Sequence, residues 1–89
     1  MRDRQDLERQ YLGYIRACLE DKLMMDAPDH WPDERLEALE DTHINSVRND
    51  AASFDAAMLD DEITMKRHAY VAVAILEQAI QREIANDLP

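Results

Sequence analysis

The feature that most constrains the fold of this chain is the scarcity of residues that break helices. Its 89 residues include one glycine, Gly13, and three prolines, and the stretch 33–88 contains neither residue type. Apolar residues recur at helical spacing instead of alternating as they do in a strand, and residues with high helix propensity dominate. The sequence therefore predicts an all-α fold.

The prolines mark the end of the first helix. Pro28 and Pro32 each push the residue before them out of helical geometry, so the segment 26–33 is predicted to be a loop. A first helix is predicted before it, over about 3–25. Pro32 suits the first position of the next helix, because proline lacks the N–H group that has no partner there.

Two further helices are predicted after the loop. One apolar stripe keeps its phase along the second helix, and its members are Leu36, Leu39, His43, Val47, Phe54 and Met58. This coherence predicts a continuous helix over 32–59 with weak points at 49–53, where the helix could instead kink or break. Asp60 suits the N-cap of a third helix over about 61–86. The prediction is a single helical domain, 1–89, built as a small bundle of three helices.

The first and third helices carry more apolar surface than one partner helix can cover. The first helix has one stripe with Leu7, Tyr11, Tyr14, Cys18 and Met25, and a second stripe with Leu12, Leu19 and Leu23. The third helix is apolar nearly all round at 69–76, and such a helix must be covered on both sides. We therefore predict a homodimer. Its predicted interface consists of Leu12, Leu19, Leu23, Val71 and Ile75.

The net charge of −10 lies entirely in the middle of the chain. Twelve acidic residues stand against Arg35 and Arg48 over 26–62, while the two flanking segments are each neutral. An acidic balance disfavours direct binding to a nucleic-acid backbone, which attracts lysine and arginine, and favours a basic partner protein. The predicted partner-binding residues are Glu34, Glu37, Asp41, Asp55, Asp60, Asp61, Glu62 and Trp31. Trp31 either covers the end of the bundle or is an exposed anchor for the partner.

No set of residues predicts a reaction. Glu40 and His43 have the Glu-x-x-His spacing of metal sites in helical bundles. A second such pair is absent from the sequence, so both are weak metal-ligand candidates and a packed, hydrogen-bonded His43 is favoured. Cys18 lies on an apolar stripe, where burial keeps a thiol unreactive, and one glycine cannot supply a phosphate-binding loop. We predict no enzyme activity and no cofactor.

Four functional hypotheses are compatible with these features. The favoured one is a non-enzymatic interaction protein that binds and regulates or inhibits a basic partner, as small acidic helical proteins encoded by phages do against host defence. The second is a nucleic-acid mimic, such as an anti-CRISPR protein. Carboxylates three or four positions apart on a helix lie about 5–6 Å from each other, a spacing comparable with that of phosphates along a nucleic-acid strand. The third is a metal-binding bundle, and the fourth is a structural subunit of an assembly. The polar N-terminal segment and the lack of an apolar run near about 18 residues predict a cytoplasmic protein without a membrane partner.

Overall fold

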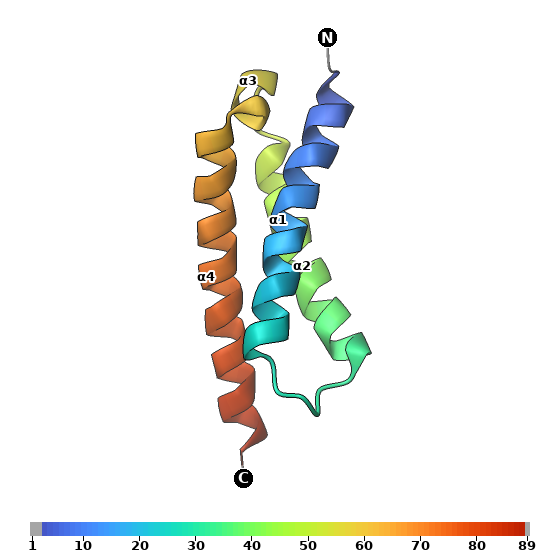
Figure 1. Ribbon diagram of the computed structural model, residues 1–89, viewed down its shortest axis with the longest axis vertical. Helices are drawn as coiled ribbons and strands as arrows, with labels where there is room; N and C mark the ends of the chain where they lie inside the picture. Colours follow the sequence, from blue (N-terminus) through green and yellow to red (C-terminus); the bar gives the residue numbers. More distant parts are fainter. Residues whose placement is uncertain (1–2, 89) are drawn as a thin grey trace.

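The computed structural model describes residues 3–88, and all regular secondary structure within that range is α-helix. The helices are α1 (Arg4–Asp26), α2 (Asp33–Ala51), α3 (Ala56–Asp60) and α4 (Glu62–Asp87). α1 and α4 run in the same direction and α2 runs opposite to both, so the three long helices form a bundle (Figure 1). The bundle is elongated, with extents of 53 × 20 × 19 Å. The predicted all-α fold is confirmed.

The loop between α1 and α2 closes one end of the bundle with Trp31. This residue is 4% exposed, and the guanidinium of Arg35 lies 4.0 Å from the centre of its ring. Arg35 also reaches α4, where its Nη2 atom lies 3.2 Å from Glu83 and its Nη1 atom 2.9 Å from Asp87. The prediction of Trp31 as a partner-binding anchor is therefore wrong, because intramolecular packing covers the ring.

The predicted continuous second helix is also wrong, because α2 ends at Ala51. The backbone N–H groups of Ser53 and Phe54 bond to carbonyls three residues earlier, which tightens the last turn and redirects the chain. Asp55 then caps α3, and its Oδ1 atom accepts a hydrogen bond of 2.9 Å from a backbone N–H three residues on. The break lies at the predicted weak points, 49–53.

A side chain from the first turn of α1 holds this break in place. The guanidinium of Arg4 donates hydrogen bonds to the carbonyls of Ala51, Ala52 and Phe54. The C-terminal end of a helix has unbonded carbonyls and a partial negative charge, and a cation there satisfies both. Arg4 thereby joins the start of α1 to the end of α2.

The N-cap of α4 lies one residue later than predicted. Asp60 is the last residue of α3, so its backbone is helical and cannot adopt the extended conformation of an N-cap. Asp61 has that extended conformation, and its side chain accepts a hydrogen bond of 3.3 Å from the N–H of Thr64. The corner between α3 and α4 is therefore built from the acids Asp60 and Asp61.

The hydrophobic core follows one winding face of α1. Its largest fully buried side chains are Tyr11, Ile15, Leu19, Ile44, Leu59, Leu76 and Ile80. On α1 the buried positions are every fourth residue from Leu7 to Leu23, a spacing that turns the face by about 40° at each step. The predicted α1 stripe is corrected at Met25, which is exposed, and at Tyr14, which is partly exposed. The buried residues of α4 include Met65, Ala69, Leu76 and Ile80, which recur at helical spacing.

The winding face also decides which residues are free to meet another chain. Leu19 and Leu23 have exposures of 0% and 5%, so placing them at a dimer interface is wrong. The reason is that α1 packs against both α2 and α4, which cover Leu19 and Leu23 within one chain. Leu12 is partly buried against the same core. Val71 and Ile75 are 49% and 53% exposed, and a homodimer through them stays a prediction.

Candidate functional site

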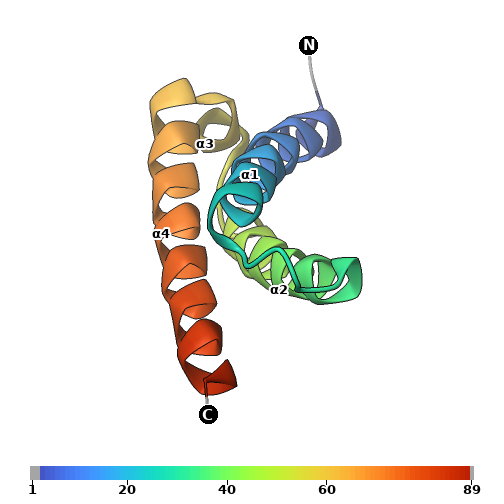
Figure 2. The same ribbon diagram turned by 60° about the horizontal axis from the view of Figure 1, so that its bottom comes forward.

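A groove lies between the C-terminal half of α1 and the N-terminal half of α2. The two helices diverge toward the loop that joins them (Figures 1 and 2), and the groove has a volume of about 330 Å³. We call it the acidic groove, because its lining combines four carboxyl groups with three apolar side chains. The lining residues are Glu20, Leu23 and Met24 of α1 and Asp33, Leu36, Glu37 and Glu40 of α2.

The register of α1 against α2 explains why carboxyl groups gather there. The helices are antiparallel, and Nη1 of Arg16 on α1 lies 3.5 Å from Oε1 of Glu40 on α2. One turn nearer the loop, the same face of α1 carries Glu20. Glu20 therefore adds another acid beside those of α2, at a position where a second arginine would have neutralised them.

Glu40 is the buried carboxyl group of the acidic groove. The residue is 8% exposed, and its Oε1 atom accepts no hydrogen bond from the residues 3–88. The guanidinium of Arg16, at 3.5 Å, is beyond the usual N–H···O range of about 2.7–3.2 Å. A buried carboxylate with too few donors is unfavourable, so the ionised form of Glu40 is disfavoured.

The protonation of Glu40 follows from these surroundings. Burial raises its pKa from 4.5 to about 7, and hydrogen bonding and charge from Glu20 act in the same direction. Arg16 lowers this pKa and Asp41 raises it. Near neutral pH Glu40 is divided between its protonated and ionised forms. The groove can therefore bind a cation and exchange a proton, and its apolar wall suits the uncharged part of a cationic ligand.

The structure does not bring the predicted partner-binding acids to one surface. Asp55 and Asp61 are N-caps, and Glu62 pairs with Lys66 at 3.1 Å. Together with Asp60 they lie at the α3 end of the bundle, away from the acidic groove. Caps and paired charges have partners within the chain, which explains the presence of these acids without an external ligand.

The other predicted acids lie on the first half of α2. Asp41 is 3.7 Å from Arg16. Glu34 and Glu37 are exposed, and no ion pair of the described residues includes them or Asp33. Glu34 and Glu37 are thus the members of the predicted set that keep uncompensated charge beside or within the groove.

Sequence reasoning missed Glu20, Met24 and Asp33 as site residues. The signal that could have found them is the loop over 27–32, which folds α2 back along α1. Pairing positions at equal distances on either side of this loop places Glu20 opposite Leu39, within one turn of Glu37 and Glu40. The loop conformation sets the register to within a turn, and that conformation was not predicted.

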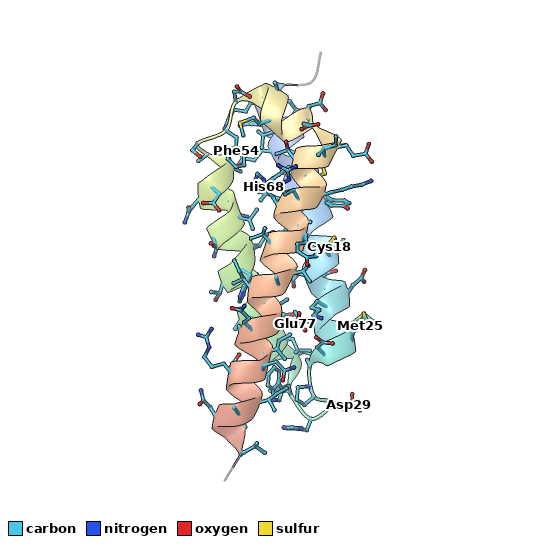
Figure 3. The ribbon with its side chains drawn as sticks, turned by 90° about the vertical axis from the view of Figure 1, so that its left-hand side faces the viewer. Cys18, Met25, Asp29, Phe54, His68 and Glu77 are labelled. Atoms are coloured by element: carbon cyan, nitrogen blue, oxygen red, sulfur yellow. The ribbon has the colours of Figure 1, made fainter. Side chains whose placement is uncertain are left out.

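A second hollow, of about 90 Å³, lies between α2 and α4. The hydroxyl of Tyr11 and Nδ1 of His68 are 2.7 Å apart in it, and Phe54 stacks on His68 with ring centroids 5.0 Å apart. Figure 3 shows Phe54 and His68 next to each other at the α3 end of the bundle. Burial, followed by the charge of Asp50, raises the pKa of Tyr11 to about 12. Tyr11 therefore stays protonated at neutral pH, and its hydroxyl shares a structural hydrogen bond with His68.

The weak metal candidates Glu40 and His43 lie on different sides of α2. Glu40 lines the acidic groove, whereas His43 lines the hollow beside α4. The Nδ1 atom of His43 donates a hydrogen bond of 2.7 Å to the carbonyl of Leu39, as predicted for a packed histidine. Over the described part of the chain, no three His, Cys, Asp or Glu side chains are grouped so that they could hold a metal ion.

Comparisons with protein-family models, with curated proteins and with solved structures find no match to this chain. Between residues 3 and 88, no helix combines the length and apolar character that crossing a membrane requires.

Proposed function

We propose that this chain is a non-enzymatic interaction protein that binds and regulates or inhibits a basic partner protein through the acidic groove and the adjoining exposed face of α2. The observation that carries this proposal is uncompensated charge. The segment 33–41 has five acidic residues and one basic residue, Arg35, and Arg16 of α1 is shared between only two of these acids, Glu40 and Asp41. Arg35 reaches toward α4 instead, where it pairs with Glu83 and Asp87.

The repulsion within this segment supports a partner of opposite charge. Glu37 lies three or four positions from Asp33, Glu34, Glu40 and Asp41, and like charges at these spacings destabilise a helix by about 0.2–0.5 kcal/mol per pair. A basic surface placed against α2 relieves this repulsion on binding. Concentrated charge of one sign also speeds and orients encounter with such a surface.

Exposed apolar side chains beside the groove also support an interface. Met24, which lines the groove, is 84% exposed, and its neighbour Met25, on the outer side of the last turn of α1 (Figure 3), is 79% exposed. Methionine is flexible and polarisable, which suits surfaces that adapt to a partner. An apolar contact bordered by charge is the usual composition of a protein interface.

A nucleic-acid mimic is the alternative that one observation favours. Glu34, Glu37 and Asp41 are exposed on α2 at spacings of three and four residues, which gives a row of carboxylates about 5–6 Å apart. The pairing of Asp41 with Arg16 shortens the row, so the mimic is the second proposal. It requires that added DNA or RNA displace the chain from its partner.

The experiment that tests the proposal is affinity capture from a lysate of the native host, at salt concentrations of about 0.1 M and about 0.5 M. Nuclease treatment removes bridging nucleic acid. We expect one basic protein to be retained at low salt and released at high salt. Retention that does not depend on salt, or capture of the chain itself alone, would mean that the acidic surface only solubilises the protein.

A further inference from the structure

We infer that the acidic groove receives one arginine side chain of the basic partner, and that Glu40 releases a proton as the guanidinium enters. This inference rests on the proposed function, whose partner it describes at the level of one side chain. It commits to a site within the groove and to a change of protonation that a contact elsewhere on the α2 surface does not produce.

The shape and lining of the groove suit a single long side chain. Its volume of about 330 Å³ is at the lower end of the range of about 300–1,000 Å³ for ligand sites. Leu23, Met24 and Leu36 supply an apolar wall, against which methylene groups can lie while a charged head reaches the carboxyl groups. An elongated cation with an apolar stem matches both parts of the lining.

The carboxyl group of Glu40 is where the charged head is expected to bind. Oε1 is buried and accepts no hydrogen bond from the described residues, although the residue is 8% exposed and lines the groove. The guanidinium of Arg16 is 3.5 Å from Oε1 and also lies 3.7 Å from Asp41. Arg16 is thus shared between two carboxyl groups and neutralises Glu40 only in part, and the exposed part of Glu40 is where a cation in the groove meets this carboxyl group.

Arginine fits this acceptor set better than lysine does. Its planar guanidinium has five N–H donors, bonds carboxylates in a bidentate manner and is weakly hydrated. The carboxyl groups of Glu20, Glu37 and Glu40 line one groove, so several acceptors are available to one guanidinium. A lysine ammonium is a compact, strongly hydrated charge that loses more on leaving water.

The proton balance follows from the burial of Glu40 beside Glu20. Before binding, Glu40 holds a proton in a fraction of molecules set by pH. An entering guanidinium favours the carboxylate, so the proton passes to solvent and an ion pair replaces the O–H group. The charged groups that face Glu40 are Arg16 and Glu20 on α1 and Asp41 on α2. With a pKa of about 7 in the free protein, release of one proton makes affinity rise about tenfold between about pH 6 and pH 8.

The test is a titration of the protein, with its amides observed by NMR, using a blocked alanine peptide that contains one arginine. Matched peptides carry lysine or uncharged citrulline at the same position. We expect saturable shifts at residues 20–24 and 33–40, stronger binding of arginine than of lysine, and none of citrulline. The side-chain carboxyl carbon of Glu40 should move toward its ionised shift when the arginine peptide is added below about pH 7.

Two variants separate this inference from a general attraction of charges. Glu40→Gln should weaken arginine binding and remove its pH dependence, whereas Asp21→Asn, which removes an exposed carboxyl of α1 outside the groove lining, should preserve both. Equal binding of lysine and arginine, or a pH-independent affinity of the wild type, would overturn the inference. A captured partner that binds Glu40→Gln as well as it binds the wild type would also overturn it and leave the proposed function standing. Binding of the arginine peptide without capture of any partner protein would support the arginine site and count against the proposed function.

Discussion

Replacing Glu40 with glutamine is expected to stabilise the protein at alkaline pH and to change its stability little at acidic pH. Glutamine resembles the protonated carboxyl group in shape but cannot ionise. The folded structure raises the pKa of Glu40 from 4.5 to about 7, mainly by burial and next through Glu20. At about 1.4 kcal/mol per pKa unit, ionisation costs the wild-type fold about 3 kcal/mol. Stabilisation by the protonated carboxyl is complete below pH 4.5 and is lost as the pH rises through about 7.

Urea unfolding followed by circular dichroism, at about pH 4 and about pH 8, measures this difference. Glu40→Gln should match the wild type at the acidic pH and exceed its free energy of unfolding by about 2–3 kcal/mol at the alkaline pH. Asp21→Asn is the matched control and should have a small effect at both. A Glu40→Gln variant that is no more stable than the wild type at alkaline pH would refute the reasoning, because it would mean that Arg16 accommodates the ionised carboxylate fully.

Two further predictions concern the fold and the assembly. Arg4→Gln should lower the free energy of unfolding by about 1–2 kcal/mol, because Arg4 donates hydrogen bonds to carbonyls at and just after the end of α2. Amide hydrogen exchange should accelerate at residues 51–54, and the exposed Arg9→Gln is the control. An unchanged exchange rate would show that Arg4 does not hold the break. For the homodimer, sedimentation equilibrium should give twice the chain mass for the wild type and the monomer mass for Ile75→Glu, since Ile75 is 53% exposed; a monomeric wild type would contradict the dimer.

The fold was predictable where a local signal decides the structure. Pro28 and Pro32 predicted the loop between α1 and α2, and the predicted third helix over about 61–86 matches α4 closely. The end of α2 was harder, because the apolar phase continues from Val47 to Phe54 while local weak points favour a break. The hydrogen bonds of Arg4, which come from a residue about 50 positions earlier in the chain, support the break. Apolar spacing along one helix cannot reveal such bonds.

The candidate site was less predictable, because it depends on contacts between helices. The two apolar stripes of α1 can be covered by a second chain or by two helices of the same chain, and the structure has the second arrangement for Leu19 and Leu23. Charge counting identified the acidic segment but could not separate caps such as Asp55 from unpaired acids such as Glu37. Glu40 was noted for its spacing to His43, whereas its burial against Glu20 depends on the register that the loop sets.

The measurement that tests the central claim most directly is the affinity of the captured partner for two charge-matched double variants. Glu34→Lys with Glu37→Lys reverses two acids at the acidic groove and beside it, and Asp6→Lys with Glu62→Lys changes the net charge equally at the other end of the bundle. The account predicts that the first variant weakens binding at least about tenfold while the second binds nearly as the wild type does. Equal weakening by both variants would show that net charge matters and the groove does not, and no weakening by either would contradict an acidic binding surface altogether.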